Sequence, residues 1–213
     1  MIYAFLVATI LITLAELGDK TQLLALVLAT RYKVGQVLIG IFVATLLVHL
    51  MSTLVGQVIG NFIPRAVLSW VAGVLFVGFG VWTLRGDSVD EDDAPEPRFG
   101  PVLTTGVAFF LAEIGDKTQI MTMTIAADPG AALRTFGGFA RAWLPAAAAQ
   151  PSRAATFWGV WMGSTLGMVI ADGLAILIGA VLGKRLPERL ITRVSGVIFI
   201  LFGVAMVVGQ YLG

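Results

Sequence analysis

The sequence predicts an all-α, polytopic membrane protein whose six transmembrane helices form a 3+3 inverted repeat. Three observations predict this fold: an apolar composition, six long apolar stretches, and an internal duplication. Of the 213 residues, 58% are hydrophobic and 13% are charged, and the mean hydropathy is +0.92. An apolar stretch of about 20 residues can cross the hydrocarbon core of a bilayer as a helix. This composition excludes a soluble globular domain.

The six expected spans follow from the apolar stretches. They cover residues 2–30, 36–60, 66–84, 102–127, 156–182 and 190–211. The first and fifth are longer than a bilayer requires, so we expect them to be tilted or broken. The first span follows Met1 directly, without a basic region or a small-residue cleavage site, and it is therefore expected to be retained rather than removed as a signal peptide.

A duplication divides the chain into two three-helix repeats, residues 1–84 and 102–213, joined by an acidic cytoplasmic linker at 85–101. Segments 60–81 and 183–204 share nine identities in 22 positions at an offset of 123 residues. Each repeat holds an odd number of spans, so the second one enters the membrane from the opposite side. Inverted repeats of this kind are typical of secondary transporters.

The second repeat is longer than the first. A duplicated motif described below has an offset of 97 residues, compared with 123 for the later helices, which indicates a 26-residue insertion near 128–153. The insertion is compatible with an interfacial helix outside the membrane and equally with a loop. The acidic run Asp90–Asp93 lacks the spacing of an EF-hand, so we interpret it as part of a solvated linker.

The basic residues of the loops predict the orientation, because cytoplasmic loops carry an excess of Lys and Arg. Eight follow the odd-numbered spans, namely Arg31, Lys33, Arg85, Arg98, Lys184, Arg185, Arg189 and Arg193. Four follow the second and fourth spans, namely Arg65, Arg134, Arg141 and Arg153. Both termini are therefore expected outside the cytoplasm.

The most informative feature is a charged motif that occurs twice inside apolar spans. Residues 15–22 recur as residues 112–119 with seven identities in eight. Because a charge at bilayer depth costs roughly 3 kcal/mol, a duplicated charged cluster indicates function. On a continuous helix Glu16 would be close to Asp19 and could pair with Lys20. The glycines Gly18 and Gly115 can loosen the helices at these points.

Inverted symmetry is expected to bring both motifs together near the midplane of the membrane. The candidate metal ligands are Glu16, Asp19, Glu113 and Asp116, supported by Lys20, Thr21, Gln22, Lys117, Thr118 and Gln119. Oxygen donors of this kind suit Mn²⁺, Ca²⁺ or Mg²⁺. Four carboxylates and two lysines leave a charge of −2, which one divalent cation or two protons would neutralise. This set is sufficient for a cation/proton exchanger.

Two alternative interpretations of these residues remain. The acids and lysines could form a neutralised structural clamp between helices, and the threonines and glutamines could bond across helices instead of binding metal. Asp172 and His49 occupy equivalent positions at the offset of 123 residues and are candidate proton relays. His49 could equally be a buried group that only donates and accepts hydrogen bonds.

The duplicated E-x-G-D-K-T, in Glu16–Thr21 and Glu113–Thr118, resembles the motif of a family of small Golgi-type and bacterial Mn²⁺/Ca²⁺:proton exchangers. The resemblance covers the chain except the insertion. It implies Mn²⁺ or Ca²⁺ as transported substrates, protons as counter-ions, and the four motif acids as ligands. It also implies a protein of metal homeostasis that is not an enzyme, with no catalytic residues and no bound cofactor.

The remaining composition narrows the setting. A net charge of +1 gives no indication of nucleic-acid binding, and the absence of cysteine excludes disulfides, thiolate metal sites and thiol catalysis. The expected partners are a divalent ion, protons and the lipid bilayer, and the expected location is a bacterial inner membrane. The alternatives from other classes are an intramembrane phosphatase-type enzyme and an exporter of small organic solutes. Four acids disfavour an anionic substrate for the exporter, and phosphate binding by the enzyme is disfavoured because Lys20 and Lys117 each stand beside an acid.

Overall fold

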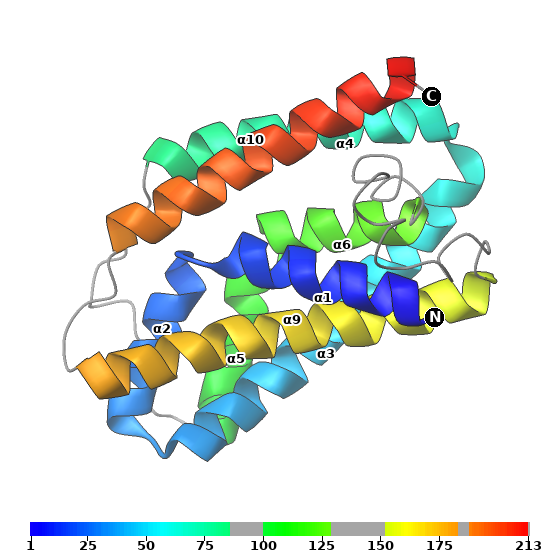
Figure 1. The fold of residues 1–213 in the computed structure, drawn as a ribbon. Coiled ribbons are helices and arrows are strands. Elements are labelled where there is room, and N and C mark those ends of the chain that lie inside the picture. Colours follow the sequence, from blue (N-terminus) through cyan, green and yellow to red (C-terminus); the bar gives the residue numbers. More distant parts are fainter. Residues whose placement is uncertain (86–99, 129–151, 183–187, 213) are drawn as a thin grey trace.

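The computed structural model describes residues 1–85, 100–128, 152–182 and 188–212, and these form eight helices and no strand. The helices are α1 (Ile2–Glu16), α2 (Lys20–Arg31), α3 (Val34–Phe62), α4 (Arg65–Arg85), α5 (Pro101–Glu113), α6 (Lys117–Ala127), α9 (Arg153–Leu182) and α10 (Glu188–Leu212) (Figure 1). Most of the linker and of the insertion lies outside the described residues.

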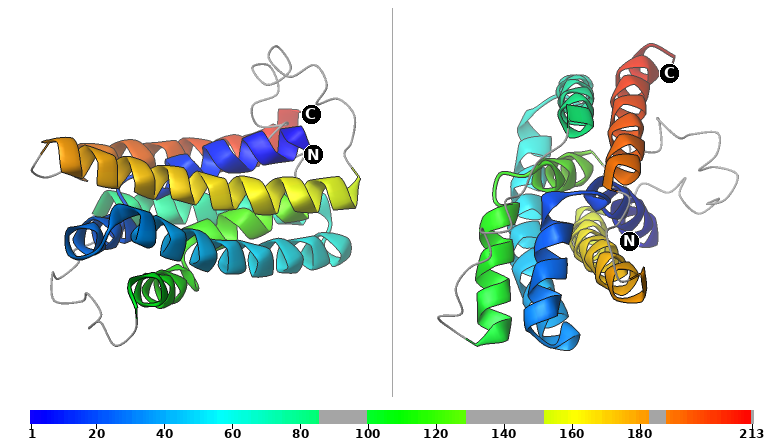
Figure 2. Two further views of the ribbon diagram at one scale, coloured as in Figure 1. Left: turned by 90° about the horizontal axis from the view of Figure 1, so that it is seen from below. Right: turned by 90° about the vertical axis from the view of Figure 1, so that its left-hand side faces the viewer.

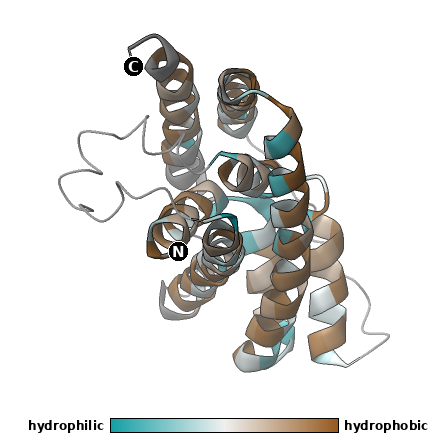
Figure 3. Ribbon diagram, turned by 90° about the vertical axis from the view of Figure 1, so that its right-hand side faces the viewer, coloured by the Kyte–Doolittle hydropathy of each residue, from teal (hydrophilic) through white to brown (hydrophobic). Residues whose placement is uncertain are grey.

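The helices are those of a membrane protein. Three helices are long and apolar enough to cross a bilayer: Val34–Phe62, Ala66–Arg85 and Arg153–Ala180. The pair α1 and α2 makes a fourth if it is counted as one span, with a bend of 79° at its break. Shorter apolar helices lie at Pro101–Glu113 and Gly196–Val208. Figure 3 shows that hydrophobic residues dominate the helices, with hydrophilic segments in the middle of the bundle.

Two of the expected spans are interrupted at a glycine. α1 ends at Glu16 and α2 begins at Lys20, and the intervening Gly18 has φ +79°. α5 and α6 are separated in the same way by Gly115, with φ +83°. Positive φ is accessible to glycine because it has no Cβ. The first span, expected to be tilted or broken, is broken at Gly18, the loosening expected at Gly115 is also a break, and α9, in the fifth span, is one continuous helix.

α1 lies along α9 in the same direction, and the glycines of α9 allow the close approach. A Cβ added at Gly159 would lie 3.0 Å from the Cβ of Ala4, and one added at Gly163 would lie 3.1 Å from that of Ala8. Each glycine lies 155 residues after its partner in the sequence. Because this separation is the same at both contacts, the two helices run parallel. Small residues at this spacing let helix backbones pack closely in lipid.

The close helix contacts occur in pairs that follow the two sequence offsets. In each pair, the glycines differ by 123 residues and their partners by 97. The pairs are Gly163 with Ala8 and Gly40 with Thr105, and then Gly179 with Leu26 and Gly56 with Met123. The two repeats therefore use the same positions to pack α1 on α9, α5 on α3, α2 on α9 and α6 on α3.

α4 and α10 form a separate antiparallel pair along one flank of the molecule (Figures 1 and 2). A Cβ added at Gly73 would lie 2.8 Å from the carbonyl oxygen of Gly203, and one added at Gly80 would lie 2.7 Å from that of Gly196. The rings of Phe76 and Phe202, 5.0 Å apart, pack edge to face beside this crossing. Backbone contact at four glycines lets these two helices cross closely.

Two apolar clusters fill the bundle. The larger one joins α1, α6 and α9 to the α4/α10 pair, and the smaller one joins α2, α3, α5 and α9. The two helix breaks lie between these clusters, so the charged motif residues are held at the centre of the molecule.

Candidate cation site

Each motif folds around its helix break in the same way. The backbone N–H of Gly18 donates to Oε1 of Gln22 at 2.9 Å, and that of Gly115 donates to Oε1 of Gln119 at 2.7 Å. The glutamines therefore use their amide oxygens to close the loops. The side-chain nitrogen of Gln22 also donates to the carbonyl oxygen of Ala171, 3.1 Å away, which ties the first break to α9.

The threonines orient the glutamates. Oγ1 of Thr21 donates to Oε1 of Glu16, and Oγ1 of Thr118 donates to Oε2 of Glu113 at 2.8 Å. Both glutamates are fully buried. In the described part of the chain, Oε2 of Glu16 and Oε1 of Glu113 have no hydrogen-bond partner. Each glutamate thus offers one free oxygen to the interior, and a buried acceptor of this kind is costly unless a ligand satisfies it.

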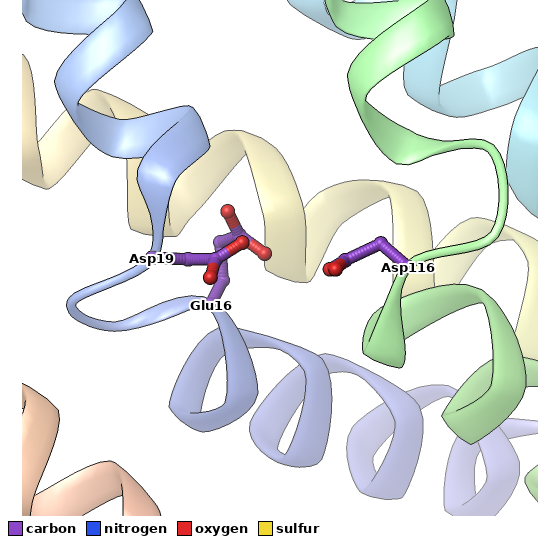
Figure 4. Close-up of side chains that lie close together, drawn as sticks. All are labelled: Glu16, Asp19 and Asp116. Carbon is purple, nitrogen blue, oxygen red and sulfur yellow. The ribbon is translucent and has the colours of Figure 1, made fainter. Parts of the chain in front are cut away.

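Three carboxylates from the two motifs converge. The ligand oxygens of Glu16, Asp19 and Asp116 lie within 4.8 Å of one another. Figure 4 shows Glu16 and Asp19 side by side at the first break, with Asp116 pointing toward them from the second. Glu113 lies outside this group, although it is near enough for its charge to act on Glu16. The sequence expectation that the motifs meet therefore agrees with the geometry of three of the four acids.

An ion pair links the two motifs. Nζ of Lys117 lies 2.6 Å from Oδ1 of Asp19, and both side chains are buried. Nζ of Lys117 also lies 5.9 Å above the ring of Phe199. The expected pairing of Lys20 with Glu16 is wrong, because the helix breaks between them and the i,i+4 geometry is lost. Within the described residues, Lys20 makes no ion pair.

A cavity of about 170 Å³ adjoins the cluster. Asp19, Asp116 and both lysines line it together with the glycine loops. The rest of its wall comes from Ala112 and Ile114 and from the last turns of α4, namely Phe79, Trp82 and Thr83. No charge or motif on α4 indicates that this helix reaches the motifs, although Phe79 aligns with Phe202 in the duplication.

Asp172 on α9 and His49 on α3 are both fully buried. Neither carboxylate oxygen of Asp172 and neither ring nitrogen of His49 has a hydrogen-bond partner among the described residues. Asp172 is close enough to act electrostatically on Glu16 and Glu113, and Asp19 acts on it in turn. Asp172 is thus a fifth carboxylate near the cluster, which the charge count from the motifs alone omits.

Chemically, this arrangement suits a hard divalent cation. It offers several carboxylate oxygens at short range and a neighbouring cavity lined by acids, and none of the described residues that form the cluster or line the cavity carries sulfur. Carboxylate oxygens are the ligands that Mn²⁺ and Ca²⁺ accept readily. The buried lysine limits the negative charge that accumulates when no cation is bound.

Comparison with known proteins agrees with this chemistry. A family model described as "Divalent cation/proton antiporter GDT1" matches residues 4–91, 101–152 and 146–213. A Vibrio cholerae protein named "Putative manganese exporter" is 36% identical over 195 residues, covering 91% of this chain and 85% of its own length. "GDT1-like protein sll0615" of Synechocystis is 30% identical over 225 residues, covering 96% of both chains. No solved structure matches the chain.

Proposed function

Because the chain belongs to the GDT1 family of divalent cation/proton antiporters, we propose that it exports a divalent cation from the cytoplasm in exchange for protons. Mn²⁺ is the principal substrate and Ca²⁺ the second. The name of the Vibrio cholerae relative supports both the manganese preference and the direction. An antiporter moves ions without transforming a substrate, so the phosphatase-type enzyme and the organic solute exporter are not favoured.

The observation that carries this proposal is the convergence of three carboxylates from two motifs nearly 100 residues apart in sequence. Glu16, Asp19 and Asp116 present oxygens within 4.8 Å of one another, next to a cavity. Buried carboxylates in this number need a cation or protons to balance their charge. A structural clamp would need one basic partner for each acid, and of the four motif acids only Asp19 makes an ion pair with a described residue.

The cation site comprises all four motif acids, with Glu113 joining the cluster during the transport cycle. Thr21 and Thr118 orient the glutamates, while Gln22 and Gln119 hold the loops that carry the aspartates. Lys20 and Lys117 balance charge when no metal is bound. Asp172 and His49 are candidate proton relays, and the proximity of Asp172 to Glu16 supports this role more strongly for Asp172.

The exchange is nearly electroneutral. With Asp172 protonated and therefore neutral, the four ionised motif acids and two lysines leave −2, which one M²⁺ or two H⁺ restores to zero. Because an unbalanced charge is costly within the membrane, the empty ionised site switches sides slowly and the loaded site switches readily. A transport rate that is almost independent of membrane voltage at a fixed pH gradient is the expected result. A steep voltage dependence would contradict this stoichiometry.

The chain crosses the membrane six times as a 3+3 inverted repeat, with α1–α2 and α5–α6 each forming one broken span. The contacts that recur at offsets of 123 and 97 residues support this arrangement. The membrane is a bacterial inner membrane, and both termini lie on its non-cytoplasmic side. Single cysteines at Ser88 and Ser152 should react with an impermeant reagent from opposite sides. Labelling of Ser88→Cys from outside intact cells would reverse the orientation.

Transport by the purified protein in proteoliposomes tests the function. Mn²⁺ uptake, recorded together with an internal pH dye, should be accompanied by proton efflux from the vesicles. Asp19→Asn should abolish both signals, whereas Asp90→Asn in the linker should leave both unchanged. Mn²⁺ uptake without any proton movement would reject antiport. The same assay with Ca²⁺, Co²⁺ and Zn²⁺ ranks the substrates.

A further inference from the structure

The cavity beside the cation site is bounded by only one end of the α4/α10 pair. On α4 its wall is formed by Phe79, Trp82 and Thr83. The equivalent positions on α10, 123 residues later, are Phe202, Ala205 and Met206. In an inverted repeat these two sets face opposite sides of the membrane. The α4 set lies toward the cytoplasm, because the linker that follows α4 is assigned to that side.

The α10 set is closed where the α4 set is open. Phe202 and Met206 are 5% and 3% exposed, and both belong to the large apolar cluster that includes Ala8 and Ile12 of α1. In contrast, Phe79 is only partly buried at the edge of the same cluster, and Trp82 is 61% exposed.

The helices that end at the two breaks differ in the same way. Ala112, in the last turn of α5, lines the cavity. Its equivalent at the offset of 97 residues, Ala15 in the last turn of α1, is 2% exposed and lies in the large apolar cluster. One side of the site is therefore sealed by apolar packing, and the equivalent place on the other side is a cavity.

The α4/α10 pair is packed as one unit. Its four glycines bring the two backbones into direct contact, and Phe76 packs between Phe199 and Phe202. Beyond this crossing, the most extensive packing of the pair on the rest of the molecule is that of α10 on α1 and of α4 on α6, and Nζ of Lys117 on α6 lies over the ring of Phe199 on α10. No comparably extensive packing of α4 on α5 or of α10 on α2, the symmetry-related contacts, occurs among the described residues.

We propose that Phe79, Trp82 and Thr83 form the cytoplasmic gate of this transporter, that Phe202, Ala205 and Met206 form the opposite gate, and that the α4/α10 pair opens one as it closes the other. The structure is the state with the cytoplasmic gate open. When the pair tilts, α4 packs on the face of α5 that carries Thr105 and Ala108, the equivalents of Ala8 and Leu11. The proposal rests on the proposed antiport function and topology.

The same switch between the two gates accounts for the position of Glu113. In the observed state the cluster is Glu16, Asp19 and Asp116, and Lys117 pairs with Asp19. Exchanging the repeats turns this cluster into Glu113, Asp116 and Asp19, with Lys20 paired to Asp116. The two aspartates then hold the cation in both states, and the glutamates alternate. Gate movement is thereby coupled to the cation site through residues that are already near it.

Cysteine labelling tests the gates directly, because the chain has no cysteine of its own. In metal-free membranes, Thr83→Cys should react with an impermeant maleimide from the cytoplasmic side, and Met206→Cys should react at least about tenfold more slowly from the other side. Ala205→Cys replaces Met206→Cys if the latter does not fold. Equal labelling rates at the two gates would overturn the proposal.

A substitution that holds one gate open sharpens the test. Ala205→Trp places in the opposite gate the residue that α4 carries at the equivalent position, and it should prevent that gate from closing. Labelling of Thr83→Cys should then fall several-fold and labelling of Met206→Cys should rise. Val204→Trp is the matched control, because Val204 is 46% exposed and faces away from the cluster. Unchanged labelling in Ala205→Trp would overturn the coupling of the gates.

These measurements also separate the gates from the transported ion. Labelling reports which gate is open whether or not Mn²⁺ is the substrate. The expected labelling without Mn²⁺/H⁺ exchange in proteoliposomes would reject the proposed function and leave the gates standing. Mn²⁺/H⁺ exchange together with equal labelling at both gates would support the proposed function and reject the gates.

Discussion

The two copies of the motif share seven of eight residues, yet they have different surroundings. The first copy supplies two of the three clustered carboxylates, and its Asp19 is paired with Lys117. The second copy supplies only Asp116 to the cluster, and Lys20 does not form the equivalent ion pair among the described residues. Local structure is the same in both copies, since each Thr bonds its Glu and each Gln closes its glycine loop.

The difference teaches that a duplicated sequence specifies equivalent parts without requiring an equivalent arrangement. Because the parts are equivalent, the mirror arrangement has similar contacts available to it and need not differ greatly in free energy. A ligand that favours one arrangement over the other can then shift the population between them. The asymmetry observed between the copies is what an exchanger needs to present one site alternately to two sides.

Substitution of either aspartate should have the largest effect, because both remain in the cluster in either arrangement. Asp19→Asn and Asp116→Asn should each reduce Mn²⁺ transport on the order of 100-fold or more, since loss of even a partner of a metal ligand costs about 10–100-fold. Initial rates of Mn²⁺ uptake into proteoliposomes measure this. A tenfold or greater difference between the two variants would mean that the copies are not interchangeable.

The two glutamates should have effects of similar size on transport and opposite effects on the labelling of Thr83→Cys. Glu16→Gln and Glu113→Gln should each slow turnover by about 10–100-fold. Glu16→Gln weakens the cluster seen here and should lower the labelling of Thr83→Cys, whereas Glu113→Gln should raise it. Gln is close to Glu in shape, so the fold should be retained. Full transport by Glu113→Gln would remove that residue from the mechanism.

The lysines should differ more in stability than in transport. Lys117→Ala leaves Asp19 buried without its counter-charge, and breaking a buried pair costs about 3–5 kcal/mol. The thermal midpoint in detergent should therefore fall further for Lys117→Ala than for Lys20→Ala. Added Mn²⁺ should restore more of the loss in Lys117→Ala, because the cation replaces the missing charge. Equal midpoints for both variants would show that the ion pair seen here is not populated.

The threonines should give the smallest effects. Thr21→Val and Thr118→Val each remove one hydrogen bond to a glutamate while keeping the shape of the side chain. A net loss of about 1 kcal/mol corresponds to roughly a fivefold weaker Mn²⁺ affinity. Competition between Mn²⁺ and a fluorescent metal indicator measures this. A change beyond about 100-fold would make the threonines direct ligands rather than groups that orient the glutamates.

Much of the fold could be predicted from the sequence because it depends on apolar length and on repetition. The expected spans at 36–60, 66–84 and 156–182 correspond to α3, α4 and α9, each within a few residues at both ends. The glycine break at Gly18 was also predictable from its place beside charges in an apolar span. Gly115 holds the same place in the second copy, so a weakened helix was predictable there as well, although span length pointed to tilted or broken helices only in the first and fifth spans.

The pairing of charges was the part that could not be predicted. Lys20 with Glu16 was the natural choice from helical spacing, but that spacing applies only to a continuous helix. The observed partner of Asp19 is Lys117, 98 residues away, and its identity depends on how the two breaks meet in space. The cavity wall on α4 could not be predicted either. Its residues Phe79, Trp82 and Thr83 carry no charge that marks them in the sequence.

The parallel contact of α1 with α9 also has a consequence for biosynthesis. Gly159, the partner of Ala4, is synthesised 155 residues after it, and Lys117, the partner of Asp19, is synthesised 98 residues after it. At a synthesis rate of about 5–20 residues per second, this delay lasts roughly 5–30 seconds. During that time the nascent first span carries Glu16 and Asp19 into the bilayer without their final neighbours. Its retention in the membrane must therefore depend on the insertion machinery, or on protonation of the acids, until the later helices arrive.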